Sequence, residues 1–226
     1  MIACPRIKVL SIILLASLLG ACAAPPKYDY SAFQNSRPRS ILVLPPQNES
    51  PDVNASYSVL SHATLPLAES GYYVFPVTLV DETFRQNGLD NPADIHQVPI
   101  TKLREIFGAD AALYINVKQY GTSYAVVSSE TRVTAEGRLL DLKTGDTLWT
   151  GSATASSKEG NNNNSGGGLV GLLVKAIVTQ IIESATNRSH PIAGVTTQRL
   201  LAAGRANGIL YGPRSPKYMK DGSPAP

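Results

Sequence analysis

Residues 111–156 read AALYINVKQYGTSYAVVSSETRVTAEGRLLDLKTGDTLWTGSATAS, and this stretch decides the fold. Three parts of it alternate apolar with polar residues and are rich in Val, Tyr and Thr, which is the pattern of strands with one buried and one wetter face. The segment Lys143-Thr144-Gly145-Asp146 separates the last two parts and has the chemistry of a hairpin turn. The stretch therefore predicts a three-stranded antiparallel meander.

Strand-like and helical patterns alternate before the meander. They predict two βα units, with strands at 40–44 and 72–77 and helices at 56–70 and 80–87. Pro66 is expected to kink or divide the first of these helices, because proline lacks an N–H and its ring clashes with the preceding turn. Another helix is expected at 99–107, with Pro99 at its start and Gly108 after it.

Two helices are expected after the meander. A Gly/Asn-rich connector at 160–168 leads into the first, at 169–187, and the second covers 192–207. The chain is therefore predicted to be an α/β-layered (α+β) protein. Two N-terminal βα units, the three-stranded antiparallel meander and C-terminal helices surround one mixed sheet in a single domain at 40–211. A Pro/Gly-rich tail follows at 212–226.

The N-terminus has the features of a secretory signal peptide at 1–21. Two cations precede an apolar run, which is about half the roughly 20 residues that a transmembrane helix needs. Leu19-Gly20-Ala21-Cys22 resembles the bacterial lipobox, in which the cysteine receives a diacylglyceryl group and becomes the new N-terminus. We therefore expect lipidation at Cys22. The other cysteine, Cys4, leaves with the signal peptide, so the mature chain has no disulfide.

Residues 22–39 are predicted to be the lipidated N-terminus and a tether that holds the body up to roughly 50 Å from the lipid. Ala23 and Ala24 resemble the outer-membrane default of Gram-negative lipoproteins, so we expect a lipid-anchored protein of the outer membrane that faces the periplasm. The mature chain contains 18 Lys and Arg against 17 Asp and Glu, a net charge of +1. Such a charge argues against a nucleic-acid partner.

No catalytic or metal-binding constellation is evident, and no cofactor is predicted. The three histidines, His62, His96 and His190, lie far apart without ligand spacing. His62 is expected to be packed or capping, whereas the other two are expected at the surface. An enzyme remains the alternative only if a deep pocket joins His62 or His96 to a carboxylate. A phosphate loop at 166–168 is disfavoured, because no Gly-Lys-Ser/Thr ending follows it.

The predicted helix at 169–187 is apolar on nearly every side, which requires burial on more than one face. It is either a central core helix or an interface, and both interpretations stay open. As an interface it predicts a homodimer, because closed two-fold pairs are the commonest oligomers. The candidate interface residues are Leu169, Leu172, Leu173, Ile177 and Ile181.

Five segments carry a resemblance to a known family. ILVLPPQNES (41–50), PLAESGYYVFPV (66–77), KLREIFGADAALYINVKQYG (102–121), LLDLKTGDTLWTG (139–151) and ILYGPRSPKY (209–218) resemble Gram-negative lipoproteins of unknown function. The resemblance implies a fold similar to the N-terminal domain of TolB and to the periplasmic domain of the curli-type channel. Members are often encoded beside a lipoprotein similar to the curli secretion channel, which implies a candidate partner. The family has no assigned catalytic residues.

These observations together predict an outer-membrane lipoprotein that is not an enzyme. We expect a non-catalytic accessory or protein-binding component of an envelope or secretion assembly. Its partners would be the membrane, through the N-terminal lipid, and envelope proteins. The alternative is an envelope hydrolase or small-ligand-binding protein with a site that the order of the sequence hides.

Overall fold

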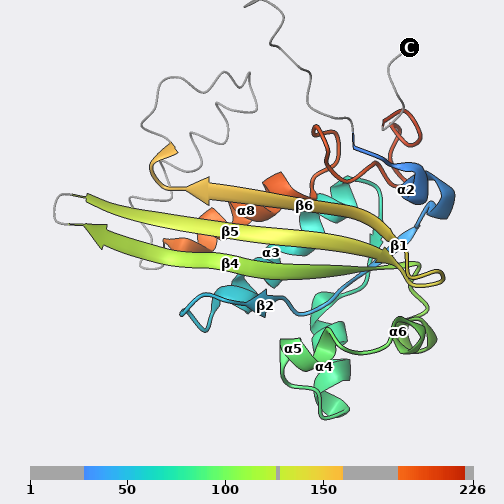
Figure 1. Ribbon diagram of the computed structural model, residues 1–226, viewed down its shortest axis with the longest axis horizontal. Coiled ribbons are helices and arrows are strands. Elements are labelled where there is room, and N and C mark those ends of the chain that lie inside the picture. The colour runs from blue at the N-terminus through green and yellow to red at the C-terminus, as the bar shows by residue number, and fades with distance from the viewer. Residues whose placement is uncertain (1–27, 126–127, 160–187, 222–226) are drawn as a thin grey trace, which may run out of the picture.

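The computed structural model describes residues 28–125, 128–159 and 188–221 (Figure 1). The strands are β1 (Ser40–Val43), β2 (Gln47–Asn48), β3 (Tyr73–Val74), β4 (Ala111–Ala125), β5 (Ser128–Asp141) and β6 (Thr147–Ser156). The helices are α2 (Ser31–Ser36), α3 (Ala55–Glu69), α4 (Val77–Gln86), α5 (Pro92–Ile95), α6 (Ile100–Phe107) and α8 (Ser189–Leu201).

One mixed sheet organises the molecule, with the strand order β3-β1-β4-β5-β6 and β2 paired with β4 beside this path. β1 is parallel to both of its neighbours, whereas β4, β5 and β6 form the predicted antiparallel meander. The hairpin between β5 and β6 turns at Gly145. This residue has φ +83°, a value that glycine adopts without steric cost. The predicted α+β fold class is confirmed.

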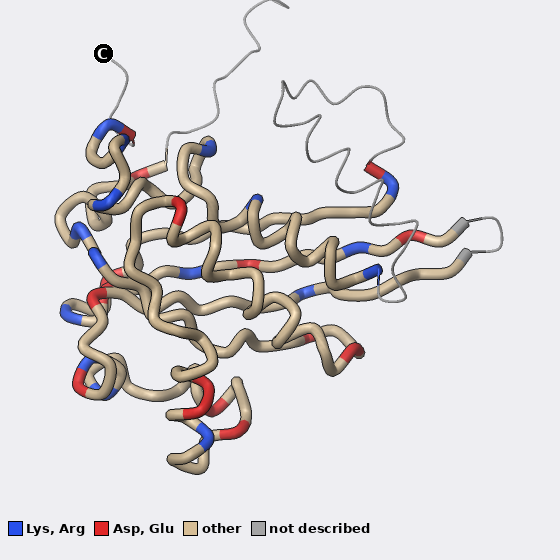
Figure 2. The backbone as a smooth tube through the Cα atoms, turned by 180° about the vertical axis from the view of Figure 1, so that it is seen from behind, with Lys and Arg blue, Asp and Glu red and all other residues tan. Residues whose placement is uncertain are grey.

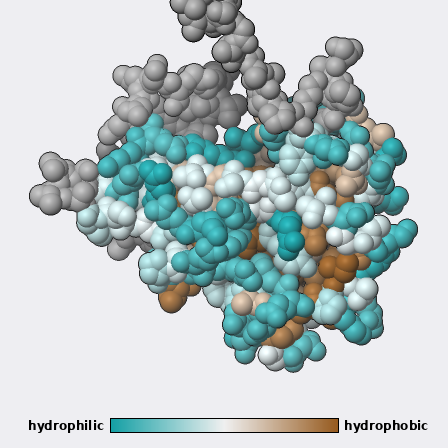
Figure 3. Space-filling view, in the orientation of Figure 1, coloured by the Kyte–Doolittle hydropathy of each residue, from teal (hydrophilic) through white to brown (hydrophobic). Residues whose placement is uncertain are grey.

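Helices cover the two faces of the sheet unequally. α3 and α8 pack on one face and form the larger core, which includes Trp149. A smaller core lies on the other face, where α4, α5 and α6 cover β1 and the start of β4. β1 is consequently buried on both faces, and Ile41 to Leu44 are 0% exposed. The rest of the second face of β4–β6 stays open, and Figure 3 shows it as mostly hydrophilic.

The first helix and the last one differ from their predicted limits. Pro66 lies in the last turn of α3, so the helix continues to Glu69 without division. α8 begins at Ser189 and ends at Leu201, six residues before the predicted end at 207. The chain then turns through Gly204, at φ +83°. The helix predicted at 169–187, with its candidate interface, lies outside the described residues.

The two ends of the domain are longer than predicted. Residues 28–39 were assigned to the tether, but they form α2 and pack on the body, with Phe33 only 4% exposed. Tyr30 Oη donates a hydrogen bond of 2.6 Å to the carbonyl oxygen of Gly208. Residues 212–221 of the predicted tail also pack on the body, where Gly212 N donates to the carbonyl oxygen of Ser70. The tether is therefore shorter than the sequence alone predicts.

Candidate functional site

β6 is an edge strand whose outward backbone groups are only partly occupied. Thr150 N donates to Tyr28 Oη at 2.8 Å, and the carbonyl oxygen of Thr154 accepts from Arg199 at 2.7 Å. Alternate residues of an antiparallel strand direct both backbone groups to the same side, so the N–H and C=O of Ser152 also point away from β5. No described residue bonds to these two groups. Among the described residues, the β6 edge is thus unpaired at Ser152, between two positions whose outward groups are hydrogen-bonded.

A groove of about 560 Å³ runs along this open edge. It lies between residues 151–154 of β6 and the loop after α8, and it is also lined by Trp149 and Leu200, which are buried. The Trp149 ring lies over Gly151, where an added Cβ would come within 2.2 Å of the ring. A glycine is therefore required beneath the tryptophan. Trp149 Nε1 donates to the carbonyl oxygen of Asn207, which fixes the wall of the groove.

The groove is positively charged. Arg199 forms an ion pair of 2.6 Å with Glu159, and this pair neutralises it. Arg205 forms no ion pair with any described carboxylate. Burial lowers the pKa of Arg205, and the charge of Arg199 lowers it further. An anion bound in the groove would raise the pKa of Arg205, because an opposite charge nearby favours the charged guanidinium.

A second hollow, of about 490 Å³, adjoins the groove on the open face of the sheet, and the two share Gly151 and Ser152. His96 lines it, together with Glu136 and Arg138. The His96 Nε2 atom lies 2.9 Å from the carbonyl oxygen of Pro45, and its ring packs edge-on against Tyr114. Burial lowers the pKa of His96. The charge of Arg138 lowers it further, whereas the Pro45 carbonyl raises it.

The other two histidines meet between α3 and α8. The rings of His62 and His190 stack with centroids 4.4 Å apart, and Ser58 Oγ lies 2.8 Å from His190 Nδ1. Burial lowers the pKa of His62, and the charge of His190 lowers it further. His62 is thus packed, as the sequence predicts. The sequence does not predict its contact with His190, because the two residues are 128 positions apart.

The second hollow is lined by both His96 and the carboxylate-bearing Glu136, so the enzyme alternative stated from the sequence stays open. Within the described part of the chain, no carboxylate is hydrogen-bonded or ion-paired to His62 or His96. In the same residues, no group of three or more His, Cys, Asp or Glu side chains could hold a metal ion. No described helix is long and apolar enough to cross a membrane.

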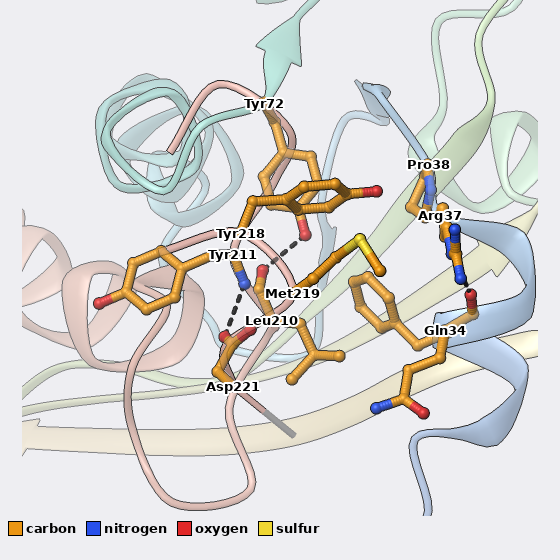
Figure 4. A pocket seen from close by; sticks show the side chains of 10 residues that line it. Gln34, Arg37, Pro38, Tyr72, Leu210, Tyr211, Tyr218, Met219 and Asp221 are labelled. Carbon is orange, nitrogen blue, oxygen red and sulfur yellow. Dashed lines mark hydrogen bonds between the residues drawn. The ribbon is translucent and has the colours of Figure 1, made fainter. Parts of the chain in front are cut away.

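A pocket of about 210 Å³ lies between α2 and the C-terminal segment (Figure 4). Phe33, Tyr72 and Leu210 form much of its apolar lining. Figure 4 shows Arg37 on one side and Asp221 on the other, where Asp221 Oδ2 accepts a hydrogen bond of 2.7 Å from Tyr211 N.

Hydrogen bonding and burial hold this pocket together. Tyr72 Oη donates to the carbonyl oxygen of Leu210 at 2.5 Å. Burial raises the pKa of Tyr72, and the charge of Asp221 adds to the rise. Burial likewise raises the pKa of Tyr30, near the pocket, to about 12. Both tyrosines therefore stay neutral donors at physiological pH.

The site residues that the sequence predicts do not lie in the groove or the pocket. Cys22 and the candidate interface at 169–187 fall outside the described residues. The groove and the pocket were both missed, because each combines segments that are far apart in the chain. Only the composition of 211–221, with two tyrosines, a methionine and an aspartate beside three cations, could indicate a structured end.

Comparison with known proteins gives concordant results. The family described as "Putative lipoprotein GNA1162-like" matches residues 28–214. A lipoprotein of Neisseria meningitidis serogroup B, NMB1124/NMB1162, is 51% identical over 198 residues, which are 87% of this chain and 91% of that protein. The crystal structure of lipoprotein GNA1162 from Neisseria meningitidis is 53% identical, with a TM-score of 0.52. It covers 65% of this chain and 100% of the other.

The match begins at Tyr28, where the folded body begins, and it includes α2, the whole sheet and α8. Membership also agrees with the lipobox at Cys22 and implies a membrane-anchored protein of the cell envelope. The chain belongs to the GNA1162-like family of lipoproteins.

Proposed function

We propose that this lipoprotein is anchored in the outer membrane, faces the periplasm and acts as a non-catalytic protein-binding component of an envelope or secretion assembly. The observation that carries the proposal is the β6 edge at Ser152, which no described residue pairs, beside a groove that Trp149 and Leu200 help to line. An exposed strand edge is a template for a further strand from another chain. Ala23 and Ala24 support the outer-membrane location.

The groove favours an extended segment with an acidic residue. Such a segment would pair its backbone with Ser152 and place apolar side chains over Trp149 and Leu200, as in other peptides that extend a sheet. Its carboxylate would lie near Arg205, which no described carboxylate pairs. The family resemblance adds one candidate partner, a lipoprotein similar to the curli secretion channel. We also propose that the fold is similar to that of the TolB N-terminal domain.

Binding of a partner strand at the β6 edge can be tested by photocrosslinking in intact cells. A photoreactive phenylalanine analogue replaces Ala206, an exposed residue that lines the groove, and a control carries it at the exposed Thr101 on α6. Adducts with envelope proteins are expected from position 206. Ser152→Pro should abolish them, because proline removes the outward N–H, whereas Ser152→Ala keeps the N–H and should preserve them. Equal adducts from both variants, with wild-type expression, would contradict strand addition.

A further inference from the structure

The exposed side chains of Arg37 and Met219 line the pocket between α2 and the C-terminal segment, and three further exposed cations lie on the C-terminal segment. We define the tether-end surface as Arg37, Arg214, Lys217, Met219 and Lys220, all of which are exposed. Arg37 and Met219 line the same pocket from opposite segments, so α2 and the C-terminal segment meet here. Figure 2 shows blue Lys and Arg positions gathered at this end of the molecule, near the C-terminus.

Charge is distributed unevenly between this end and the rest of the chain. Residues 28–39 and 211–221 contain five basic and two acidic side chains, a net charge of +3. Residues 40–210 contain 12 basic and 15 acidic side chains, a net charge of −3. The four cations of the tether-end surface have no ion pair with a described carboxylate. The protein is thus a dipole whose positive pole is the tether end.

Aromatic rings hold two of these cations at the surface. Arg214 lies over the Tyr73 ring, with its guanidinium carbon 5.5 Å from the centroid. Lys217 Nζ lies 5.4 Å from the centroid of the Tyr211 ring. Cation–π contacts of this kind orient the charges without neutralising them.

Met219 is an exposed apolar residue among these cations. It is 58% exposed and has φ +60°, a left-handed conformation that costs a residue with a side chain about 1 kcal/mol. The conformation is held by the turn in which Asp221 Oδ2 accepts from Tyr211 N. A packed turn therefore presents an apolar side chain to the outside, within a ring of positive charge.

The length of the tether places this surface at the membrane. Only six residues, 22–27, separate the lipidated position from the beginning of the folded body. Fully extended, they span about 20 Å, and they reach less than this when they are relaxed. Tyr28, which follows them, is bonded to Thr150 and cannot lengthen the tether without losing that contact. The body consequently stays beside the bilayer. Ring contacts from Tyr28 to Tyr30 and from Tyr30 to Phe33, which lines the pocket, connect the end of the tether to the tether-end surface.

We propose that the tether-end surface docks on the phospholipid bilayer that holds the anchor. Arg37, Arg214, Lys217 and Lys220 contact the phosphate groups of anionic lipids, while the Met219 side chain enters the interfacial region. Docking leaves the β6 groove beside the bilayer, because Tyr28 at the end of the tether is bonded to Thr150 next to the groove. This proposal rests on the proposed function, because the lipid on Cys22 is what holds the tether-end surface near the bilayer.

The test uses residues 22–226 with Cys22→Ala, so that no acyl group contributes to binding. Cosedimentation is measured with vesicles of phosphatidylethanolamine and phosphatidylglycerol, and with vesicles of phosphatidylcholine alone. We expect binding to the anionic vesicles that weakens as salt is added. Each cation near an anionic surface raises the partition coefficient about fivefold, so Lys217→Gln with Lys220→Gln should lower it about thirtyfold.

A matched control removes the same charge elsewhere. Arg85→Gln with Lys102→Gln, both on the α4–α6 side, should leave the partition coefficient nearly unchanged, because long-range charge alone acts weakly across a Debye length. An equal loss in the two double variants would overturn the docking surface and leave only a general charge effect. Binding of the Lys217 and Lys220 double variant at the wild-type level would overturn it as well.

The insertion of Met219 has its own readout. The test chain has no cysteine, so Met219→Cys can carry a single environment-sensitive fluorophore. Its emission should shift to the blue on anionic vesicles, whereas the same label at Thr101→Cys should not shift. An unshifted label at position 219 on bound protein would contradict insertion. Failure of these assays leaves the lipidation of Cys22 intact, because palmitate labelling of that residue tests the anchor separately.

Discussion

Gly71 permits the C-terminal segment to pack against the end of α3. It has φ +98°, and an added Cβ would lie 2.5 Å from Ser215 N and 2.8 Å from the carbonyl oxygen of Gly212. These atoms belong to the backbone and cannot move aside as a flexible side chain would. The close approach therefore connects one glycine to the position of the whole tether-end surface.

Gly71→Ala should lower the free energy of unfolding by about 3 kcal/mol, because overpacking of about 2 kcal/mol adds to the cost of the left-handed backbone. Gly88→Ala is the matched control, since Gly88 has φ +77° but no heavy atom within 4 Å of the added Cβ. That variant should lose only about 1 kcal/mol. Urea denaturation measures both, and equal losses would show that the close approach adds nothing.

The histidines predict how stability depends on pH. Burial lowers the pKa of His62 and His96 in the folded protein, so the unfolded chain takes up protons at a higher pH than the folded chain does. Stability should therefore fall as the pH drops below about 6.5, the ordinary histidine value, and level off below the folded-state pKa. His62→Gln should reduce this fall.

Urea denaturation at about pH 7.5 and about pH 5.5 measures the effect. The carboxyls whose pKa is lowered, Glu49 and Asp141 among them, lose their contribution only below about pH 4.5. The pH range in which the histidines change stability is thus separate from the range in which the carboxyls do. A His62→Gln protein with the same loss of stability as the wild type would exclude His62 as a source of the pH dependence.

At the scale of elements, the helix predicted at 169–187 keeps its two interpretations. Replacing Leu173 with Asp separates them, because an interface change should give a folded monomer, whereas a core change should unfold the chain. We expect a monomer with an unchanged circular dichroism spectrum, while the wild type scatters light as a dimer. Ile177→Asp should behave in the same way. A wild-type body that remains monomeric at high concentration would eliminate the homodimer.

Edge strands illustrate how elements acquire surfaces that their own sequence patterns do not predict. β5 and β6 have the same alternating pattern, yet β5 pairs on both sides and β6 on one. Tyr28 and Arg199 close two positions of the β6 edge, and Ser152 remains open between them. Among the described residues, the unpaired length of the edge is short, as is usual in proteins that avoid aggregation.

At the scale of the whole molecule, the lipid determines where the protein acts. Two or more acyl chains are needed for lasting attachment, because one chain binds only marginally. Cys22→Ala should abolish labelling with radioactive palmitate and release the protein from the membrane fraction. Retention of label in this variant would remove Cys22 from the account of the anchor. Weak, salt-sensitive membrane binding should survive, because the tether-end surface is intact.

The sequence by itself determined the fold class, the meander, α3 and the packed environment of His62. These features depend on periods of about two or 3.6 residues, which are local and can be recognised in a short window. The lipobox is local as well, and the family match agrees with it. Patterns of this kind require no knowledge of distant contacts.

Only the tertiary structure decided where the domain ends and which surfaces remain open. Residues 28–39 and 212–221 lack periodicity and adjoin the proline-containing segments 22–27 and 222–226, so the sequence groups them with a tether and a loose tail. They are ordered by partners far away in the chain, such as the bond from Tyr30 to Gly208 across 178 positions. The open edge of β6 likewise follows from strand order. Contacts between non-periodic segments leave no pattern in the local sequence, because each contact depends on the fold of the whole chain.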